Sequence, residues 1–259
     1  MEGIWRFLPK SRAKYFESFL EKYHAIRREE GWGSQNAAYY RELPHVEKSD
    51  PLYSVWRIRE KNFARFESFV NSKPLKILDI GTGNGWLSNQ FMRRGHIVAA
   101  LDISDDERDG LGAWRNYEKG FSWYQSEFSH MPFRETQFDL AIFNASLHYS
   151  IDLDATLIEA GRVLARGGKI IIMDSPFYSE SKNGEAMREQ QIARLGKKND
   201  LGMLGFLTHT ELNRAATEAG MKLEILAADE EWHKKLRRVM IQKKLRREPA
   251  RFPIVILKK

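Results

Sequence analysis

Residues 77–85 read Ile-Leu-Asp-Ile-Gly-Thr-Gly-Asn-Gly, an apolar run that leads into a glycine-rich turn. Residues 86–94 follow with a helical pattern, so the turn stands between a predicted buried strand and a predicted helix. Glycine tolerates positive φ angles and has no side chain to hold a ligand away, so the backbone of such a turn can approach a bound molecule closely. The pattern therefore predicts a ligand site at the carboxyl end of a strand.

Short apolar runs alternate with helical patterns around this turn. The predicted strands are 76–80, 97–101, 121–124, 138–143, 169–173, 222–226 and 254–257. The predicted helices that connect them include 105–119, 154–164 and 208–219. Such alternation is typical of an α/β fold with a mostly parallel, doubly wound sheet covered by helices on both faces, in which ligands lie at the carboxyl ends of the strands.

The remaining segments suggest how the chain is organised. Residues 11–30 and 53–71 have apolar residues at helical spacing, which predicts an N-terminal helical extension over 1–72 and an α/β domain over 73–259. Segment 175–206 is too long for a plain connection, and we expect it to border a binding site. Segment 229–250 is a predicted basic helical insertion before the last strand.

Composition excludes several classes of protein. The chain has 259 residues and no cysteine, so disulfides, thiolate metal sites and a cysteine nucleophile are excluded. The seven histidines are scattered, which predicts no metal site. No run is apolar enough for a signal peptide or a membrane span, which favours a soluble, cytoplasmic protein. The net charge of +7 resides in residues 229–259, where 11 Lys and Arg face 4 Asp and Glu.

The spacing of the glycines limits the choice of ligand. They stand at 81, 83 and 85, and position 86 is Trp, whereas a dinucleotide-binding turn would have its third glycine there. Asp79 precedes the turn by two residues. A carboxylate at that place is a poor neighbour for a pyrophosphate and a good one for a ligand with a cationic amino group and no phosphate.

This motif resembles the first motif of class I (Rossmann-like) S-adenosylmethionine-dependent methyltransferases, in their small-molecule "type 11" branch. The resemblance extends in order over residues 74–226. It includes Arg162-Val163-Leu164-Ala165-Arg166-Gly167-Gly168 before the fifth strand and Ala219-Gly220-Met221 before the sixth. It implies a seven-stranded sheet with an antiparallel last strand, S-adenosyl-L-methionine as cofactor, and a small-molecule methyl acceptor.

The resemblance also implies roles for individual residues. Asp102, at the end of the second strand, would bind the ribose hydroxyls, and Ile103 would cover the adenine. Glu127 precedes Met131-Pro132-Phe133 by four residues, and it would contact the adenine amino group beside Phe128. The residues that would wrap the methionine part are Asp79, Gly81, Thr82, Gly83, Asn84, Gly85 and Asn144. His148 and Tyr149 are the candidate catalytic residues, since an ordinary imidazole accepts a proton near neutral pH.

Other interpretations remain open at this point. Asp79 could merely tie down the turn, and Asn144, His148 and Tyr149 could cap a helix or pack under the sheet. The basic segment 229–259 would suit an RNA methyltransferase, although a solvated helix face is the commoner reason for such a charge run. A non-catalytic adenosyl-binding module would retain the same motifs. The aromatic N-terminal helices and segment 175–206 are the candidate walls of the acceptor pocket, but the sequence does not identify the acceptor.

Overall fold

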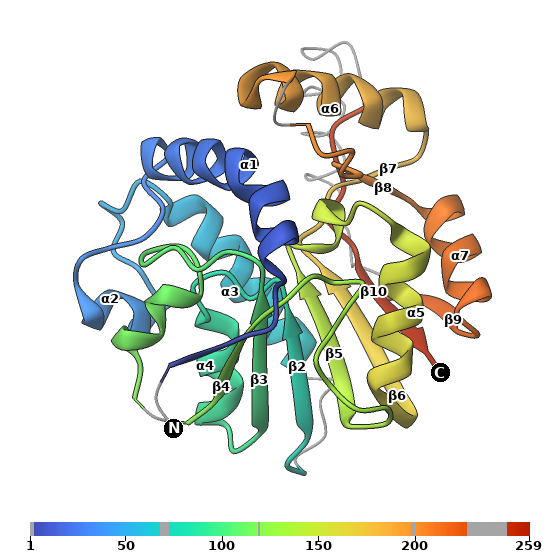
Figure 1. The fold of residues 1–259 in the computed structure, drawn as a ribbon, viewed down its shortest axis with the longest axis horizontal. Helices are drawn as coiled ribbons and strands as arrows, with labels where there is room; N and C mark the ends of the chain where they lie inside the picture. The colour runs from blue at the N-terminus through green and yellow to red at the C-terminus, as the bar shows by residue number, and fades with distance from the viewer. Residues whose placement is uncertain (1–2, 68–72, 119, 198–199, 227–247) are drawn as a thin grey trace.

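The computed structural model describes residues 3–67, 73–118, 120–197, 200–226 and 248–259. One eight-stranded sheet forms the centre, with strand order β1-β4-β3-β2-β5-β6-β10-β9. Its strands are β1 (Ile4–Arg6), β2 (Lys76–Ile80), β3 (Ile97–Asp102), β4 (Ser122–Gln125), β5 (Phe138–Asn144), β6 (Leu164–Met173), β9 (Lys222–Leu226) and β10 (Ile254–Lys258). All are parallel except β10, which runs antiparallel to both β6 and β9 (Figure 1). The predicted Rossmann-like sheet is confirmed.

The eighth strand was not expected. The N-terminal residues were assigned to a helical extension, yet β1 pairs in parallel with β4, with Ile4 opposite Trp123. Three residues are too few to reveal a period of two, and β4 offers an unpaired edge that main-chain hydrogen bonds can extend. The N-terminus therefore contributes a strand before its helices begin.

Helices cover both faces of the sheet, as predicted (Figure 1). One face carries α3 (Tyr53–Glu67) and α4 (Trp86–Arg93). Their aromatic residues share a buried cluster with the side chains of the central strands that point to this face. The other face carries α5 (Leu153–Val163) and α7 (His209–Glu218) around a second cluster. A short α2 (Ala37–Glu42) lies at the first face. The N-terminal extension thus packs onto the sheet through a core that it shares with α4.

Two helices lie beyond the carboxyl ends of the strands. They are α1 (Lys10–Glu29) and α6 (Ser181–Leu195), and Figure 1 shows both above this edge of the sheet. α6 contributes 15 residues to segment 175–206 and lies between the paired two-residue strands β7 (Phe177–Tyr178) and β8 (Leu207–Thr208). The expected basic insertion at 229–250 falls largely on residues 227–247, outside the described part of the chain.

The helix predicted at 105–119 is wrong over its first half. Only η1, a 3-10 helix at Leu111–Asn116, is present. The Asp106 carboxylate accepts hydrogen bonds from the backbone N–H groups of Arg108 and Asp109 at 2.9 Å each, which favours a turn. Local side-chain bonding therefore replaces the first helical turns.

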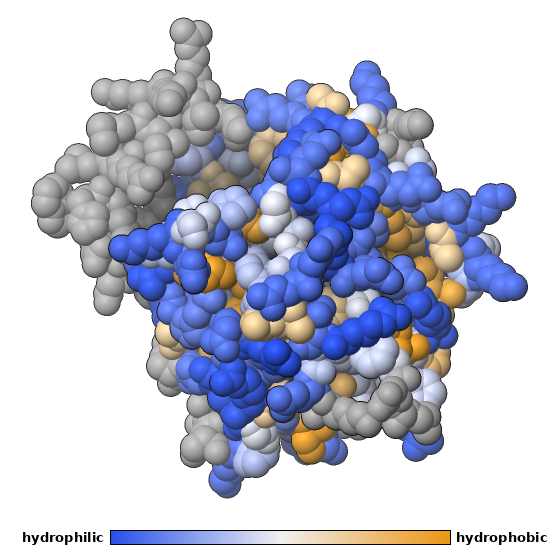
Figure 2. All heavy atoms as spheres, turned by 90° about the vertical axis from the view of Figure 1, so that its left-hand side faces the viewer, coloured by the Kyte–Doolittle hydropathy of each residue, from blue (hydrophilic) through white to orange (hydrophobic). Residues whose placement is uncertain are grey.

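Exposed apolar side chains are scattered over the described part of the surface. Figure 2 shows the side that carries α1 and α2, where hydrophobic side chains are scattered among hydrophilic ones. Exposed apolar residues such as Ile58, Ile97 and Phe252 lie on separate elements, and scattered residues of this kind are normal for a folded surface. No helix among the described residues is long and apolar enough to cross a membrane.

Candidate functional site

A cavity of about 1060 Å³ lies at the carboxyl edge of the sheet, and we call it the central cavity. Its floor is the glycine turn after β2 together with the ends of β3, β5 and β6. α1 and α6 contribute the opposite walls. Every predicted site residue except Gly85 lines this cavity.

The glycine turn adopts the conformation that its composition predicts. Gly81, Gly83 and Gly85 have φ angles of +73°, +56° and +80°. A Cβ atom on Gly81 would lie 2.3 Å from the Cβ of Ser146. Gly85 has a different role from the one expected, because its missing side chain makes room for Trp123, 2.2 Å from the position of a Cβ. Gly85 therefore serves packing beneath the turn, whereas Gly81 and Gly83 face the cavity.

Asp79 is buried below the turn and holds its shape. Its Oδ2 accepts hydrogen bonds from Thr82 Oγ1 at 2.8 Å and Ser88 Oγ at 2.7 Å. Among the described residues, its Oδ1 has no hydrogen-bonding partner. Burial raises the pKa of Asp79 to about 6 despite these two hydrogen bonds. The free Oδ1 is thus an acceptor that a donor from a ligand could satisfy.

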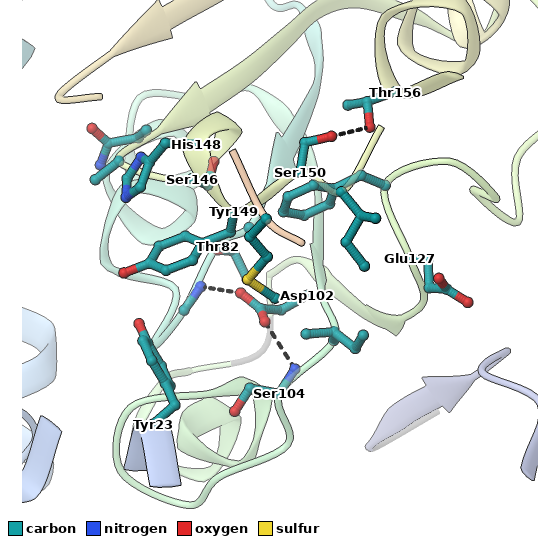
Figure 3. A pocket seen from close by; sticks show the side chains of 18 of the residues that line it. Tyr23, Thr82, Asp102, Ser104, Glu127, Ser146, His148, Tyr149, Ser150 and Thr156 are labelled. Carbon is teal, nitrogen blue, oxygen red and sulfur yellow. Dashed lines mark hydrogen bonds between the residues drawn. The ribbon is translucent and has the colours of Figure 1, made fainter. Parts of the chain in front are cut away.

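Asp102 ends β3 at the centre of the cavity floor (Figure 3). Its Oδ2 accepts from the backbone N–H of Gly83 and its Oδ1 from that of Ser104, both at 2.8 Å. These bonds couple the carboxylate to the glycine turn and leave lone pairs for ligand hydroxyls. Burial raises its pKa to about 6, so the group is mainly ionised at pH 7.

Glu127 lies across the cavity from His148 (Figure 3). It forms a bidentate ion pair with Arg12 of α1, with Nε to Oε1 at 2.7 Å and Nη2 to Oε2 at 2.6 Å. The sequence did not identify Arg12, which is 115 residues away. Phe128 lies under the turn, 3.2 Å from the position of a Cβ on Gly81. The adenine end predicted at Glu127 is therefore closed by the N-terminal helix.

The other end of the cavity contains Asn144, His148 and Tyr149. Asn144 Oδ1 is buried and has no partner among the described residues. His148 is buried as well, with Nδ1 at 3.3 Å from Ser175 Oγ. Burial lowers the pKa of His148 to about 4. The premise that this imidazole titrates near neutral pH is therefore wrong, and at pH 7 the ring is neutral.

Acid is expected to destabilise the protein through His148. Its pKa of about 4 in the folded state is below the ordinary value of 6.5, so the unfolded chain binds more protons between those two pH values. The contribution of the neutral His148 ring to the free energy of unfolding is complete above pH 6.5, and it falls as the pH drops toward 4. Between pH 7 and pH 4.5, the wild type should lose about 2–3 kcal/mol more unfolding free energy than His148→Gln.

Urea unfolding of both proteins at the two pH values measures this difference. Asp79 and Asp102, whose raised pKa values act in the opposite direction, are present in both proteins and cancel in the comparison. Parallel pH dependences of the two proteins would contradict the burial of a neutral ring.

Aromatic residues of α1 form one wall of the cavity, in the N-terminal segment that the sequence offered as a candidate wall. Phe16, Phe19 and Tyr23 line the cavity, and the Tyr23 ring meets that of Tyr149 edge-on at 5.7 Å between centroids. Figure 3 shows these two tyrosines facing one another. From the opposite side, Met187 and Gln191 of α6 complete the wall. Together these residues enclose the end of the cavity that contains His148.

The residues present suit S-adenosyl-L-methionine. The turn around Gly81 and Gly83 has no side chains where a ligand would approach, and the Asp102 carboxylate can accept from two ribose hydroxyls. The unpartnered oxygens of Asp79 and Asn144 can accept from an ammonium group. The described lining thus provides a nucleoside end and an amino-acid end.

Comparisons with known proteins agree with this geometry. Residues 78–172 match the model of a family described as "Methyltransferase domain". This segment is a class I methyltransferase domain. Its cofactor is S-adenosyl-L-methionine, and the match covers the glycine turn, Asp102, Glu127, Asn144 and both candidate catalytic residues.

Individual relatives of this methyltransferase domain have varied acceptors. A malonyl-[acyl-carrier protein] O-methyltransferase of Erwinia pyrifoliae is 28% identical over 155 residues, 60% of this chain and 57% of the relative. A demethylmenaquinone methyltransferase of Thermobifida fusca is 35% identical over 104 residues, 38% of this chain and 42% of the relative. The chain thus spans about half the length of these curated relatives.

A solved structure extends the likeness to the fold. The S-adenosylmethionine dependent methyltransferase from Mesorhizobium loti superposes with a TM-score of 0.54 at 18% identity, over 76% of this chain and 97% of that one. At this identity the likeness establishes the architecture and says nothing of the acceptor.

Proposed function

We propose that the protein transfers the methyl group of S-adenosyl-L-methionine to an oxygen, nitrogen or carbon atom of a small-molecule acceptor bound in the central cavity. The observation that carries this proposal is the extent of the cavity. It continues from Asp102 past His148 and Tyr149 to α6, and its volume of about 1060 Å³ suits two ligands at once.

Within this proposal the cofactor extends from Glu127 to Asn144. Asp102 binds the ribose hydroxyls, Ile103 and Phe128 cover the adenine, and Glu127 contacts its amino group while paired with Arg12. Asp79 and Asn144 accept from the amino group of the methionine part. Gly81, Thr82, Gly83 and Asn84 form the backbone cradle, and Gly85 supports it from below.

The bound cofactor supplies a methyl group on a sulfonium, and the protein's contribution is to position the acceptor. Holding two reactants in line can contribute on the order of 7–11 kcal/mol at the extreme. The aromatic wall of α1 gives this end of the cavity an apolar lining. His148 is neutral at pH 7, so it can orient an acceptor by a hydrogen bond, and Tyr149 can do the same through its hydroxyl. A strong base is not required for an acceptor that is already deprotonated.

An acceptor screen tests the proposed function. The protein is incubated with S-adenosyl-L-methionine and with carboxylates, with hydroxylated aromatic rings and quinols, and with amines. The first two classes resemble the acceptors of the malonyl-[acyl-carrier protein] and demethylmenaquinone methyltransferases. Formation of S-adenosylhomocysteine and methylated product in equal amounts would support the proposed function. Tight cofactor binding without product from any class contradicts it and favours the non-catalytic adenosyl-binding module.

Substitutions on α6 should affect turnover far more than cofactor binding. Met187 and Gln191 face the cavity, whereas Glu185 and Glu189 of the same helix are exposed. With an accepted substrate, Met187→Ala/Gln191→Ala should lower kcat/KM at least about tenfold, because one to two kcal/mol of contact is lost. Affinity for S-adenosylhomocysteine should stay within about threefold.

The double variant Glu185→Ala/Glu189→Ala is the matched control and should leave both quantities unchanged. Steady-state kinetics and calorimetry provide the two measurements. Equal losses of turnover and cofactor affinity in the cavity-facing variant would show that α6 does not border the acceptor.

A further inference from the structure

Arg59 of α3 is an enclosed cation that faces the central cavity. Its guanidinium lies over the rings of Trp32 and Trp56, 4.7 Å and 4.9 Å from their centroids. Among the described residues, no oxygen accepts a hydrogen bond from Arg59 and no carboxylate lies within ion-pair distance of it. The N–H donors of its planar group are therefore available to a ligand in the cavity.

The charged groups around Arg59 are already engaged elsewhere. Arg27 is bound to Asp109 at 2.5 Å and also lies over the Trp32 ring, at 3.6 Å from the centroid. Asp174, at the end of β6, accepts a hydrogen bond from Asn62 Nδ2 at 2.5 Å through Oδ1. Burial lowers the pKa of Arg59, and the attraction of Asp174 only partly opposes this effect.

A guanidinium that lines a cavity without a hydrogen-bonding partner presents its donors to a ligand that fills the cavity. The stacking on two indoles fixes the plane of the group, so its donors are presented in one geometry. Two parallel N–H donors match the two oxygens of a carboxylate.

We propose that Arg59 is a carboxylate-binding residue of the central cavity. The carboxylate belongs either to the amino-acid part of the cofactor or to the acceptor, and both sources present the same planar monoanion. The inference rests on the proposed function only in placing these ligands in the cavity. The pairing selects against ligands that lack a carboxylate, since Arg59 would then keep its unsatisfied donors.

Calorimetry with three probes distinguishes the two sources. S-adenosylhomocysteine has the adenosine and the amino-acid carboxylate, whereas 5′-methylthioadenosine has only the adenosine. Malonate is titrated into free protein and into protein saturated with S-adenosylhomocysteine. The variants are Arg59→Met and Arg59→Lys, and Arg57→Met is the matched control, since Arg57 is exposed on the same helix and pairs with Glu60.

If the carboxylate belongs to the cofactor, Arg59→Met should bind S-adenosylhomocysteine about 30-fold more weakly than the wild type does. It should bind 5′-methylthioadenosine as tightly as the wild type does. If the carboxylate belongs to the acceptor, the affinities for both nucleosides should be unchanged. Malonate should then bind to wild type saturated with S-adenosylhomocysteine but not to Arg59→Met saturated in the same way. Arg59→Lys should recover part of the lost affinity in either case, because it keeps the charge without the fork. Arg57→Met should match the wild type throughout.

Two results would overturn the proposal. One is an Arg59→Met protein that binds all three probes like the wild type. The other is an equal loss of affinity for all three probes together with a lower melting temperature, which would mean that Arg59 only supports the fold. If Arg59→Met does not fold, the affinities of Arg59→Lys for the three probes are compared with those of the wild type instead. Failure of wild type to bind either nucleoside would contradict the proposed function instead, and malonate binding to the free protein would still test Arg59.

Discussion

Replacing Asp102 by alanine is expected to weaken the binding of S-adenosyl-L-methionine about 100-fold. The ionised carboxylate can accept from two ribose hydroxyls, and charge-assisted hydrogen bonds of this kind contribute about 1.5 kcal/mol each. Their joint loss of about 3 kcal/mol corresponds to roughly two orders of magnitude in Kd. The substitution also releases the Gly83 N–H that Asp102 holds at 2.8 Å, which loosens the turn. Calorimetry at pH 7.5 measures the change.

Asp105→Ala is the matched control. Asp105 is three residues away, is exposed and pairs with Arg6 at 2.6 Å on the outer surface. The Asp105→Ala protein should bind the cofactor as tightly as the wild type does. Thermal unfolding of both variants establishes that they are folded, and unchanged affinity in folded Asp102→Ala would refute the ribose contact.

Much of the fold could be predicted because its signals are local. A buried parallel strand is a continuous apolar run, and the run before Gly81 indicates both the strand and the turn that follows it. Seven such runs became the strands β2 to β6, β9 and β10 of the sheet. β1 could not be found in this way, because three residues gain their structure from the edge of β4 rather than from their own pattern.

The floor of the site was predictable residue by residue for the same reason, whereas only the segments that form its walls could be predicted, and not the residues that face the cavity. Asp79, Asp102 and Asn144 follow directly from strand ends. Arg12 and Arg59 reach the cavity from helices whose position depends on long-range packing, and their sequence contexts resemble those of ordinary surface arginines. The low pKa of His148 has the same origin, since burial by surrounding elements cannot be inferred from a single position in the chain.

The helix α1 connects these parts of the site. His24 Nε2 lies 2.7 Å from Ser104 Oγ, and the Ser104 backbone in turn donates to Asp102. Arg12 holds Glu127 from the first turns of the same helix. The element that walls the acceptor end therefore holds Glu127 directly and is linked to Asp102 through Ser104, so the position of α1 and the binding of the cofactor should be coupled.

Gly85→Ala is expected to lower the free energy of unfolding by about 4 kcal/mol, a large part of the 5–15 kcal/mol that stabilises a typical domain. Its φ of +80° costs a residue with a side chain about 1–2 kcal/mol. The new methyl group would also lie 2.2 Å from Trp123 Cη2, and overpacking of this kind costs a further 1–3 kcal/mol. Trp123 cannot move aside readily, because it is buried and its ring packs on Phe121 at 4.6 Å.

Gly95→Ala separates the two contributions. Gly95 has a similar φ of +85°, but a Cβ there would meet nothing within 4 Å. This variant should therefore lose only the backbone component, about 1 kcal/mol. Urea unfolding of both variants provides the comparison, and the excess in Gly85→Ala measures the contact with Trp123. Equal losses would mean that the third glycine of the turn is required for its backbone angle alone, and that β4 does not press against the turn as the structure places it.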